Sequence, residues 1–162
     1  CGKKFKKSRF ITKEKYKMLI RKIELKDITE NEKELKALLR EMLELKFGKC
    51  ENKIIEVYGN MQKFIEDGSA ILIGAFEDNK IIGFIWAYEI KEETYHVNYY
   101  AVNVNNRKLG IGQKLLDELY KIAKQNGIKK VELLVEAHNE IAIKKYKNNE
   151  FEEKYIKMEK NL

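Results

Sequence analysis

The sequence predicts a mixed α/β domain with a central, mostly antiparallel sheet, a βαβ crossover and flanking helices. Three strand-like segments, 70–76, 81–90 and 94–104, follow one another with short loops between them, which indicates antiparallel pairing. A helical pattern then separates residues 94–104 from a fourth strand-like segment, 130–136. This strand–helix–strand order predicts one parallel strand pair, so the sheet should be mixed.

The elements before these strands are a strand and two helices. Residues 19–28 alternate between apolar and polar types, which predicts a strand. Residues 29–32 (TENE) have the form of a capping box, and apolar residues at helical spacing continue from there to Gly48. A second helical pattern covers residues 54–65.

The predicted elements after the crossover strand are a helix over 139–148 and a final strand over 151–158. The length of 162 residues suits one domain with a hydrophobic core. No internal repeat or low-complexity linker divides the chain after residue 17. We therefore expect residues 18–162 to form a single domain.

The net charge of +7 belongs to the start of the chain. Residues 1–17 hold eight basic residues and one acidic residue, so the rest holds 25 of the 33 basic and 25 of the 26 acidic residues. We interpret residues 1–17 as a basic tail, which is a tag, a solvated arm or a processed N-terminus. The neutral remainder argues against nucleic acid as a partner.

Cysteine and histidine are scarce, which limits metal and redox chemistry. Cys1 and Cys50 have no C-x-x-C spacing, and His96 and His138 are the only two histidines. We therefore expect neither a metal site nor a disulfide framework. No apolar run is long enough to span a bilayer. Together with the free thiols, this predicts a cytoplasmic protein.

A glycine-containing turn, residues 107–112 (RKLGIG), connects a predicted strand to a predicted helix. The first turn of a helix has backbone N–H groups without partners and lies at the positive end of the helix dipole. A phosphate group can accept hydrogen bonds from these donors, and glycine lets the backbone approach it closely. Arg107 and Lys108 add positive charge. The segment therefore predicts a pyrophosphate-binding turn.

Two nucleotide motifs do not fit this turn. A Walker A loop needs Lys and Ser or Thr after its last glycine, whereas Gln113 follows Gly112 here. A dinucleotide fingerprint needs a third glycine, and Leu115 stands in its place. The remaining pattern, R-x-x-G-x-G from Arg107 to Gly112, resembles the acetyl-CoA motif of the GNAT superfamily of N-acetyltransferases.

A second motif further along the chain strengthens this resemblance. Asn139, Ala142 and Tyr146 match the family's N-x-x-A-x-x-x-Y pattern, and Phe151 matches the aromatic residue that follows it. Asn139 can cap the predicted helix. The family usually has glycine before that aromatic residue, whereas this chain has Glu150, which puts the local backbone geometry in doubt.

The resemblance is specific from about residue 81 to residue 160 and is one of layout alone over 19–76. It implies the GNAT-like fold, with acetyl transfer from acetyl-CoA to a primary amine by direct attack in a ternary complex. The alternatives are transfer of a longer acyl group and a non-catalytic acyl-CoA-binding or regulatory module. The resemblance also implies that a homodimer is a common state, and the sequence does not fix the oligomeric state.

The resemblance implies a cofactor-binding set and a proton donor. The pantetheine arm would pair with the end of the strand at 100–102, and Tyr146 would protonate the CoA thiolate as it leaves. The expected cofactor-binding residues are Tyr100, Ala101, Val102, Arg107, Lys108, Leu109, Gly110, Ile111, Gly112, Gln113 and Asn139.

Two residues are candidates for the catalytic base. Glu136 would share a side of its strand with Glu132, and His96 would be in phase with Tyr100 along its own strand. The alternatives are a solvated strand end for Glu136 and a hydrogen-bonded strand histidine for His96. The sequence does not identify the acceptor, which could be an amino sugar, a polyamine or an aromatic amine held by aromatic side chains of the central strands.

Overall fold

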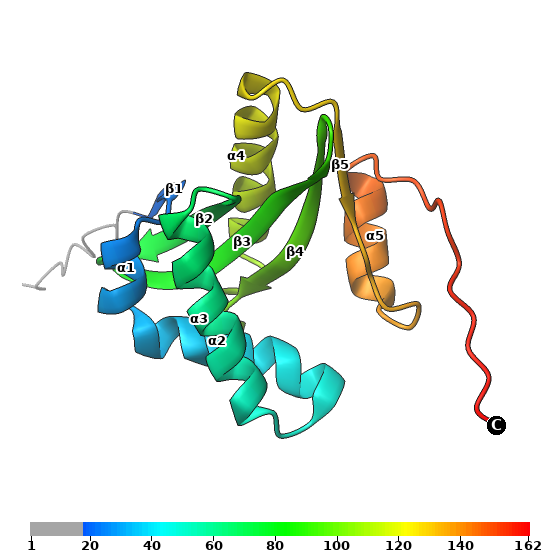
Figure 1. The fold of residues 1–162 in the computed structure, drawn as a ribbon, viewed down its shortest axis with the longest axis horizontal. Coiled ribbons are helices and arrows are strands. Elements are labelled where there is room, and N and C mark those ends of the chain that lie inside the picture. Colours follow the sequence, from blue (N-terminus) through cyan, green and yellow to red (C-terminus); the bar gives the residue numbers. More distant parts are fainter. Residues whose placement is uncertain (1–17) are drawn as a thin grey trace, which may run out of the picture.

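The computed structural model describes residues 18–162, so the basic tail predicted for 1–17 lies outside the described residues (Figure 1). Five strands form one sheet in the order β1-β2-β3-β4-β5. All neighbours are antiparallel except β4 and β5, which are parallel. The strands are β1 (Leu19–Lys22), β2 (Ala70–Glu77), β3 (Lys80–Lys91), β4 (Thr94–Val102) and β5 (Lys130–Leu133). The predicted mixed sheet is confirmed.

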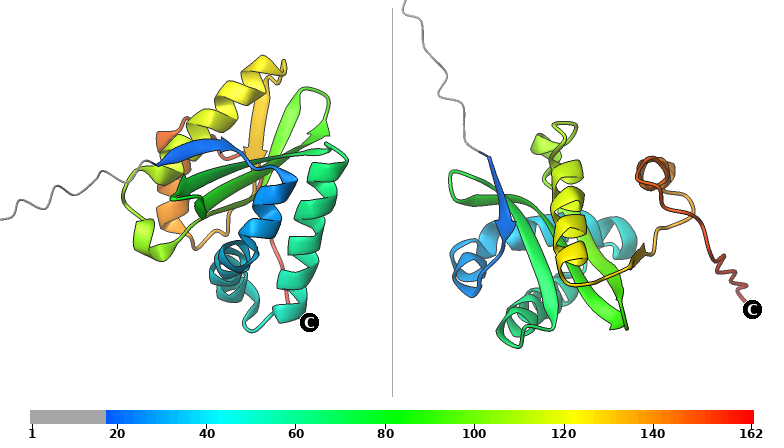
Figure 2. Two further views of the ribbon diagram at one scale, coloured as in Figure 1. Left: turned by 90° about the vertical axis from the view of Figure 1, so that its left-hand side faces the viewer. Right: turned by 90° about the horizontal axis from the view of Figure 1, so that it is seen from above.

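Helices cover both faces of this sheet and create two apolar clusters (Figures 1 and 2). On one face, α1 (Leu25–Glu30), α2 (Glu32–Phe47) and α3 (Glu51–Glu66) enclose Phe84 and Trp86. On the other, α4 (Ile111–Gln125) packs on alternate residues of the same strands. Helix α5 (Glu140–Asn148) follows β5 at the end of the sheet.

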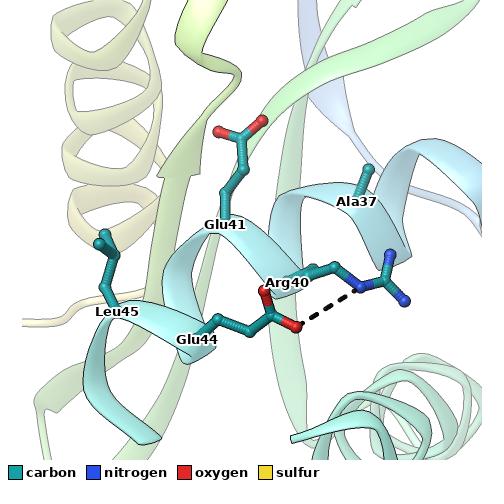
Figure 3. A pocket seen from close by; sticks show the side chains of 5 residues that line it. All are labelled: Ala37, Arg40, Glu41, Glu44 and Leu45. Carbon is teal, nitrogen blue, oxygen red and sulfur yellow. Dashed lines mark ion pairs between the residues drawn. The ribbon is translucent and has the colours of Figure 1, made fainter. Parts of the chain in front are cut away.

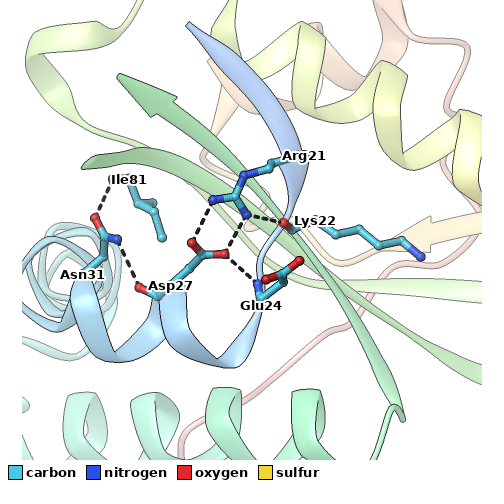
Figure 4. A network of polar contacts seen from close by, with 6 residues as sticks. All are labelled: Arg21, Lys22, Glu24, Asp27, Asn31 and Ile81. Carbon is cyan, nitrogen blue, oxygen red and sulfur yellow. Dashed lines mark hydrogen bonds and ion pairs between the residues drawn. The ribbon is translucent and has the colours of Figure 1, made fainter. Parts of the chain in front are cut away.

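The first predicted strand is shorter than expected, because the chain turns into α1 after β1. The Asp27 carboxylate accepts two hydrogen bonds from the Arg21 guanidinium, at 2.6 and 2.7 Å, and one from the Glu24 backbone N–H at 2.8 Å (Figure 4). Glu24 and Asp27 form the capping box at this point. The capping box predicted at 29–32 is wrong, since Thr29 lies inside α1.

Asn31 connects α1 and α2 to the sheet. Its side-chain amide donates to the Asp27 carbonyl oxygen at 3.1 Å, and its side-chain oxygen accepts from the Ile81 N–H at 2.9 Å (Figure 4). Asn31 is 3% exposed, so both hydrogen bonds satisfy polar atoms that would otherwise be buried alone. The start of α2 is therefore held to the sheet by a hydrogen bond between two residues that are 50 positions apart in the sequence.

A bulge in β4 changes which side chains share a face. Ala87 of β3 pairs with Val97, but the preceding residue Trp86 pairs with Tyr99, so Asn98 is an extra residue in β4. Val97 packs on the α4 side, whereas Tyr99 packs on the side of α2 and α3. One extra residue reverses the two-residue alternation of a strand. The expectation that His96 is in phase with Tyr100 is therefore wrong.

The predicted final strand over 151–158 is also wrong, because no part of residues 149–162 is helix or strand. The segment leaves the end of α5 and runs away from the sheet (Figure 1). A strand needs a neighbouring backbone for its hydrogen bonds, and no described strand lies beside this segment. Its apolar residues Tyr155, Ile156 and Met158 are exposed as a result.

Candidate cofactor and catalytic site

The turn at the centre of the site begins where β4 ends. The Asn103 side chain accepts from the Asn105 N–H at 2.9 Å and starts a short 3-10 helix, η1 (Val104–Asn106). The backbone then reverses through Lys108 and Gly110, whose φ angles are +64° and +76°. Glycine adopts this left-handed conformation at no steric cost, and Gly110 is the residue that precedes α4.

The first turn of α4 presents free backbone donors. Within residues 18–162, the N–H groups of Ile111, Gly112 and Gln113 have no acceptor, and Lys114 is the first residue whose N–H bonds back, to the Gly110 carbonyl at 3.2 Å. Three such donors at the positive end of a 15-residue helix suit an anionic group. The predicted pyrophosphate-binding turn thus has the backbone geometry that this function requires.

Arg107 stabilises this turn by linking it to the end of β4 and to α2. Its Nε donates to the Val102 carbonyl at 3.0 Å, and its guanidinium lies 3.2 Å from a carboxylate oxygen of Glu41 on α2. The same Glu41 oxygen accepts from the Val104 N–H at 3.2 Å. Sequence reasoning missed Glu41, because nothing in the pattern of α2 links it to a residue 66 positions away. The side chain of Lys108 is exposed.

Helix α5 approaches the turn through polar contacts. The side-chain amides of Gln113 and Asn149 bond reciprocally, at 2.6 and 3.0 Å. The Lys145 ammonium donates to the Tyr100 hydroxyl. Asn139 caps the helix as predicted, accepting from the Ala142 N–H at 3.1 Å. Glu150 has a φ of +64°, so a non-glycine residue takes the conformation for which the family uses glycine.

Tyr146 on α5 is half-buried and close enough to Tyr100 of β4 and Tyr120 of α4 to influence both phenols. Its ring packs edge-on against Phe151, with centroids 5.5 Å apart, and burial raises the pKa of its phenol. Burial raises the pKa of Tyr100 strongly and that of Tyr120 to about 12, with smaller contributions from the neighbouring Tyr146. All three phenols therefore hold their protons at neutral pH, which is the form that a proton donor needs.

The two candidate bases lie elsewhere. Glu136 is beyond the end of β5, is exposed, and pairs with Lys46 at 2.5 Å, a contact that lowers the pKa of its carboxyl group. His96 packs on Tyr88, with ring centroids 5.6 Å apart, and its Nδ1 lies 3.5 Å from a Glu132 oxygen. Neither residue bonds to Tyr146 or to the first turn of α4 among the described residues, and a base for this site stays a prediction.

A shallow hollow of about 460 Å³ lies along α2 and is lined in part by Glu41 (Figure 3). Arg40 and Glu44 face each other, with 3.9 Å between their charged atoms. Of the aromatic residues of the central strands, Trp86 and Tyr95 are buried in the two apolar clusters, whereas Tyr88, Tyr99 and Tyr100 are half-buried. An aromatic wall for the acceptor stays a prediction. The hollow is lined by Ala37, Arg40, Glu41, Glu44 and Leu45.

The described part of the chain contains neither a candidate metal site nor a candidate membrane-spanning helix. Residues 18–162 contain no group of three or more His, Cys, Asp or Glu side chains placed to hold a metal ion. Within the same range, no helix combines the length and the apolar character needed to cross a membrane.

The fold and the free N–H groups of the turn match what the resemblance implied for a CoA-dependent acyltransferase, and the comparison with protein families establishes this class. The acetyltransferase (GNAT) family profile matches residues 33–151, which is well over half of the chain. The chain therefore belongs to the GNAT family and is an acetyl-CoA-dependent acetyltransferase. No curated protein sequence matches it.

Solved structures of similar fold include three acetyltransferases. An aminoglycoside acetyltransferase from an uncultured soil metagenomic sample, in complex with sisomicin, has a TM-score of 0.70 at 18% identity and covers 90% of this chain and 96% of its own. The PaiA N-acetyltransferase of Thermoplasma acidophilum, in complex with CoA, has a TM-score of 0.67 at 24% identity, with 82% and 88% covered. A ribosomal-protein-alanine N-acetyltransferase from Brucella melitensis biovar Abortus 2308 has a TM-score of 0.66 at 19% identity, with 90% and 99% covered. At these identities the likeness concerns the fold.

Proposed function

We propose that this protein transfers the acetyl group of acetyl-CoA to a primary amine of a small molecule or peptide, by direct attack in a ternary complex. The observation that carries the proposal is the first turn of α4, where three consecutive backbone N–H groups, Ile111 to Gln113, lack acceptors in the described chain. These donors would hold the cofactor pyrophosphate. The residues at the end of β4, Tyr100 to Val102, would pair with the pantetheine arm.

Tyr146 is the proposed proton donor. As the amine nitrogen bonds to the thioester carbon, the C–S bond breaks and the thiolate takes the phenol proton, while the amine loses its own proton to a base or to water. The backbone N–H near Val102 would stabilise the oxygen that gains charge. Burial keeps Tyr146 protonated at neutral pH, which favours this role.

The cofactor half of the proposal is tested by binding. Acetyl-CoA at saturating concentration should raise the melting temperature by mass action, and ATP and NAD at the same concentration should not. A shift with ATP or NAD, and none with acetyl-CoA, would refute it. The acceptor would then be sought by measuring thiol release with panels of amino sugars, polyamines, amino acids and peptide N-termini.

The alternative function is a non-catalytic acyl-CoA-binding module. A variant of Tyr146 distinguishes this module from an acetyltransferase. Tyr146→Phe removes the proton donor and keeps the ring that packs on Phe151. We expect turnover to fall by about 10²-fold or more with acetyl-CoA binding retained. Loss of binding in this variant would assign Tyr146 a packing role, and absence of turnover in the wild type with every acceptor class would favour the module.

A further inference from the structure

Lys145 is a half-buried cation directly beside the first turn of α4. Its ammonium donates to the Tyr100 hydroxyl and lies 4.4 Å from the centre of the Tyr100 ring. A methyl group added at Gly112 would collide with both the Lys145 nitrogen and the Tyr100 hydroxyl oxygen. The side chain therefore crosses from α5 to β4 at the level of Gly112, in the middle of the turn that has free N–H groups.

The charge of Lys145 is not compensated at this position. No carboxylate of residues 18–162 pairs with it, and burial lowers the pKa of its ammonium. Its neighbours on α5 behave differently: Lys144 is exposed, and Lys147 is paired with Glu153 at 2.9 Å. A cation beside the positive end of a helix is unfavourable, and so is a desolvated charge without an oppositely charged partner. An anion bound on the first turn of α4 would remove both costs.

We propose that Lys145 is a phosphate-binding residue of the cofactor site and that its ammonium contacts the pyrophosphate of CoA. The proposal rests on the proposed function, because it uses the same turn. The pyrophosphate would lie between the backbone donors of Ile111 to Gln113 on one side and the Lys145 ammonium on the other. Tyr100, a neutral phenol, orients the ammonium when the cofactor is absent.

The chain offers a matched control for the test. Lys145→Met and Lys144→Met remove the same charge from adjacent positions of α5, one half-buried at the turn and the other exposed. Calorimetric titration with CoA should give about a 10-fold or larger rise in Kd for Lys145→Met, and less than a 2-fold change for Lys144→Met. Lys145→Arg keeps a cation there and should recover most of the affinity.

Phosphorus NMR of saturating CoA gives a second readout, because its pyrophosphate and its ribose 3′-phosphate have separate resonances. The pyrophosphate resonances of bound CoA should differ between the wild type and Lys145→Met, and the 3′-phosphate resonance should not. An unchanged Kd for Lys145→Met, or a change confined to the 3′-phosphate, would overturn the assignment of Lys145 alone. Failure of the wild type to bind CoA would instead overturn the proposed function.

Discussion

The two helices at the proposed site, α4 and α5, differ in what attaches them to the rest of the domain: apolar burial for α4 and mainly polar contacts for α5. Helix α4 buries six residues, among them Leu115, Leu116 and Leu119, which are fully shielded from solvent. Helix α5 buries none, and Ile141 on its surface is 86% exposed. Its described contacts with the sheet and α4 include the polar pairs Gln113–Asn149 and Lys145–Tyr100.

This difference concerns function, because the proposed site lies between the two helices. Helix α4 presents its free N–H groups from a position fixed by the core, which suits a binding surface that must keep its geometry. Helix α5 carries Tyr146 and Lys145 on an element with little apolar burial, and such elements open at low free-energy cost. We therefore expect bound cofactor to stabilise α5 much more than α4.

The largest effect should come from the core under α4. Leu116→Ala removes a side chain with 0% exposure and should lower the free energy of unfolding by about 2–5 kcal/mol, through lost burial and the cavity left behind. Ile141→Ala on α5 should cost less than about 0.5 kcal/mol. Urea unfolding of both variants measures the difference. Similar losses would show that α5 packs against the molecule more closely than its exposure indicates.

The partly buried ion pair between Arg21 and Asp27 should give the next largest effect, and one that depends on pH. The Asp27 side chain is 4% exposed, and Asp27→Asn removes the carboxylate that accepts hydrogen bonds from Arg21. The variant should lower the free energy of unfolding by about 1–3 kcal/mol at pH 7. Hydrogen bonds from Arg21 hold the folded pKa of Asp27 below its ordinary value of 3.8. The stabilisation is thus complete above about pH 4 and is lost as pH falls through the folded pKa.

The control for Asp27 is an exposed pair between the last turn of α5 and the segment that follows it. Glu153 is paired with Lys147 and its side chain is 71% exposed, so Glu153→Gln should change stability by nearly nothing. Unfolding curves at pH 7 and at pH 3 for both variants separate the two pairs. If the wild type and Asp27→Asn differ as much at the lowest pH as at pH 7, the ionised carboxylate is not what stabilises α1.

Gly112→Ala should affect binding more than folding. The new methyl group would meet the Lys145 nitrogen and the Tyr100 hydroxyl oxygen at the first turn of α4, so we expect about a 10-fold loss of CoA affinity. Gly59→Ala in α3 is the matched helix control, since nothing lies within 4 Å of its added methyl group, and should stabilise by about 0.5–1 kcal/mol. Unchanged affinity in Gly112→Ala would place the cofactor away from this turn.

The smallest effect should come from the cap of α5. Asn139→Ala removes the hydrogen bond to the Ala142 N–H and should cost about 1 kcal/mol locally. Because α5 contributes little to the core, hydrogen exchange should accelerate in residues 140–148 and stay unchanged in α4. A uniform acceleration through both helices would show that they unfold as one unit.

The sequence by itself determined the features that a few neighbouring residues encode. The order of the elements from β2 to α5, the turn at 107–112 and the cap at Asn139 follow from periodicity, glycine conformation and side-chain hydrogen bonds within one or two turns. The family resemblance depends on the same contiguous motifs. These local preferences survive folding, so most of the fold and the backbone part of the candidate site could be predicted.

Only the tertiary structure decided which distant residues meet. Glu41 reaches Arg107 and Lys145 reaches Tyr100 across 66 and 45 positions, and no local pattern connects them. The extra residue Asn98 moved His96 out of phase with Tyr100, because a bulge depends on how β4 pairs with β3. Residues 151–158 have the composition of a strand but no strand beside them, since hydrogen-bond pairing belongs to the sheet and not to the segment.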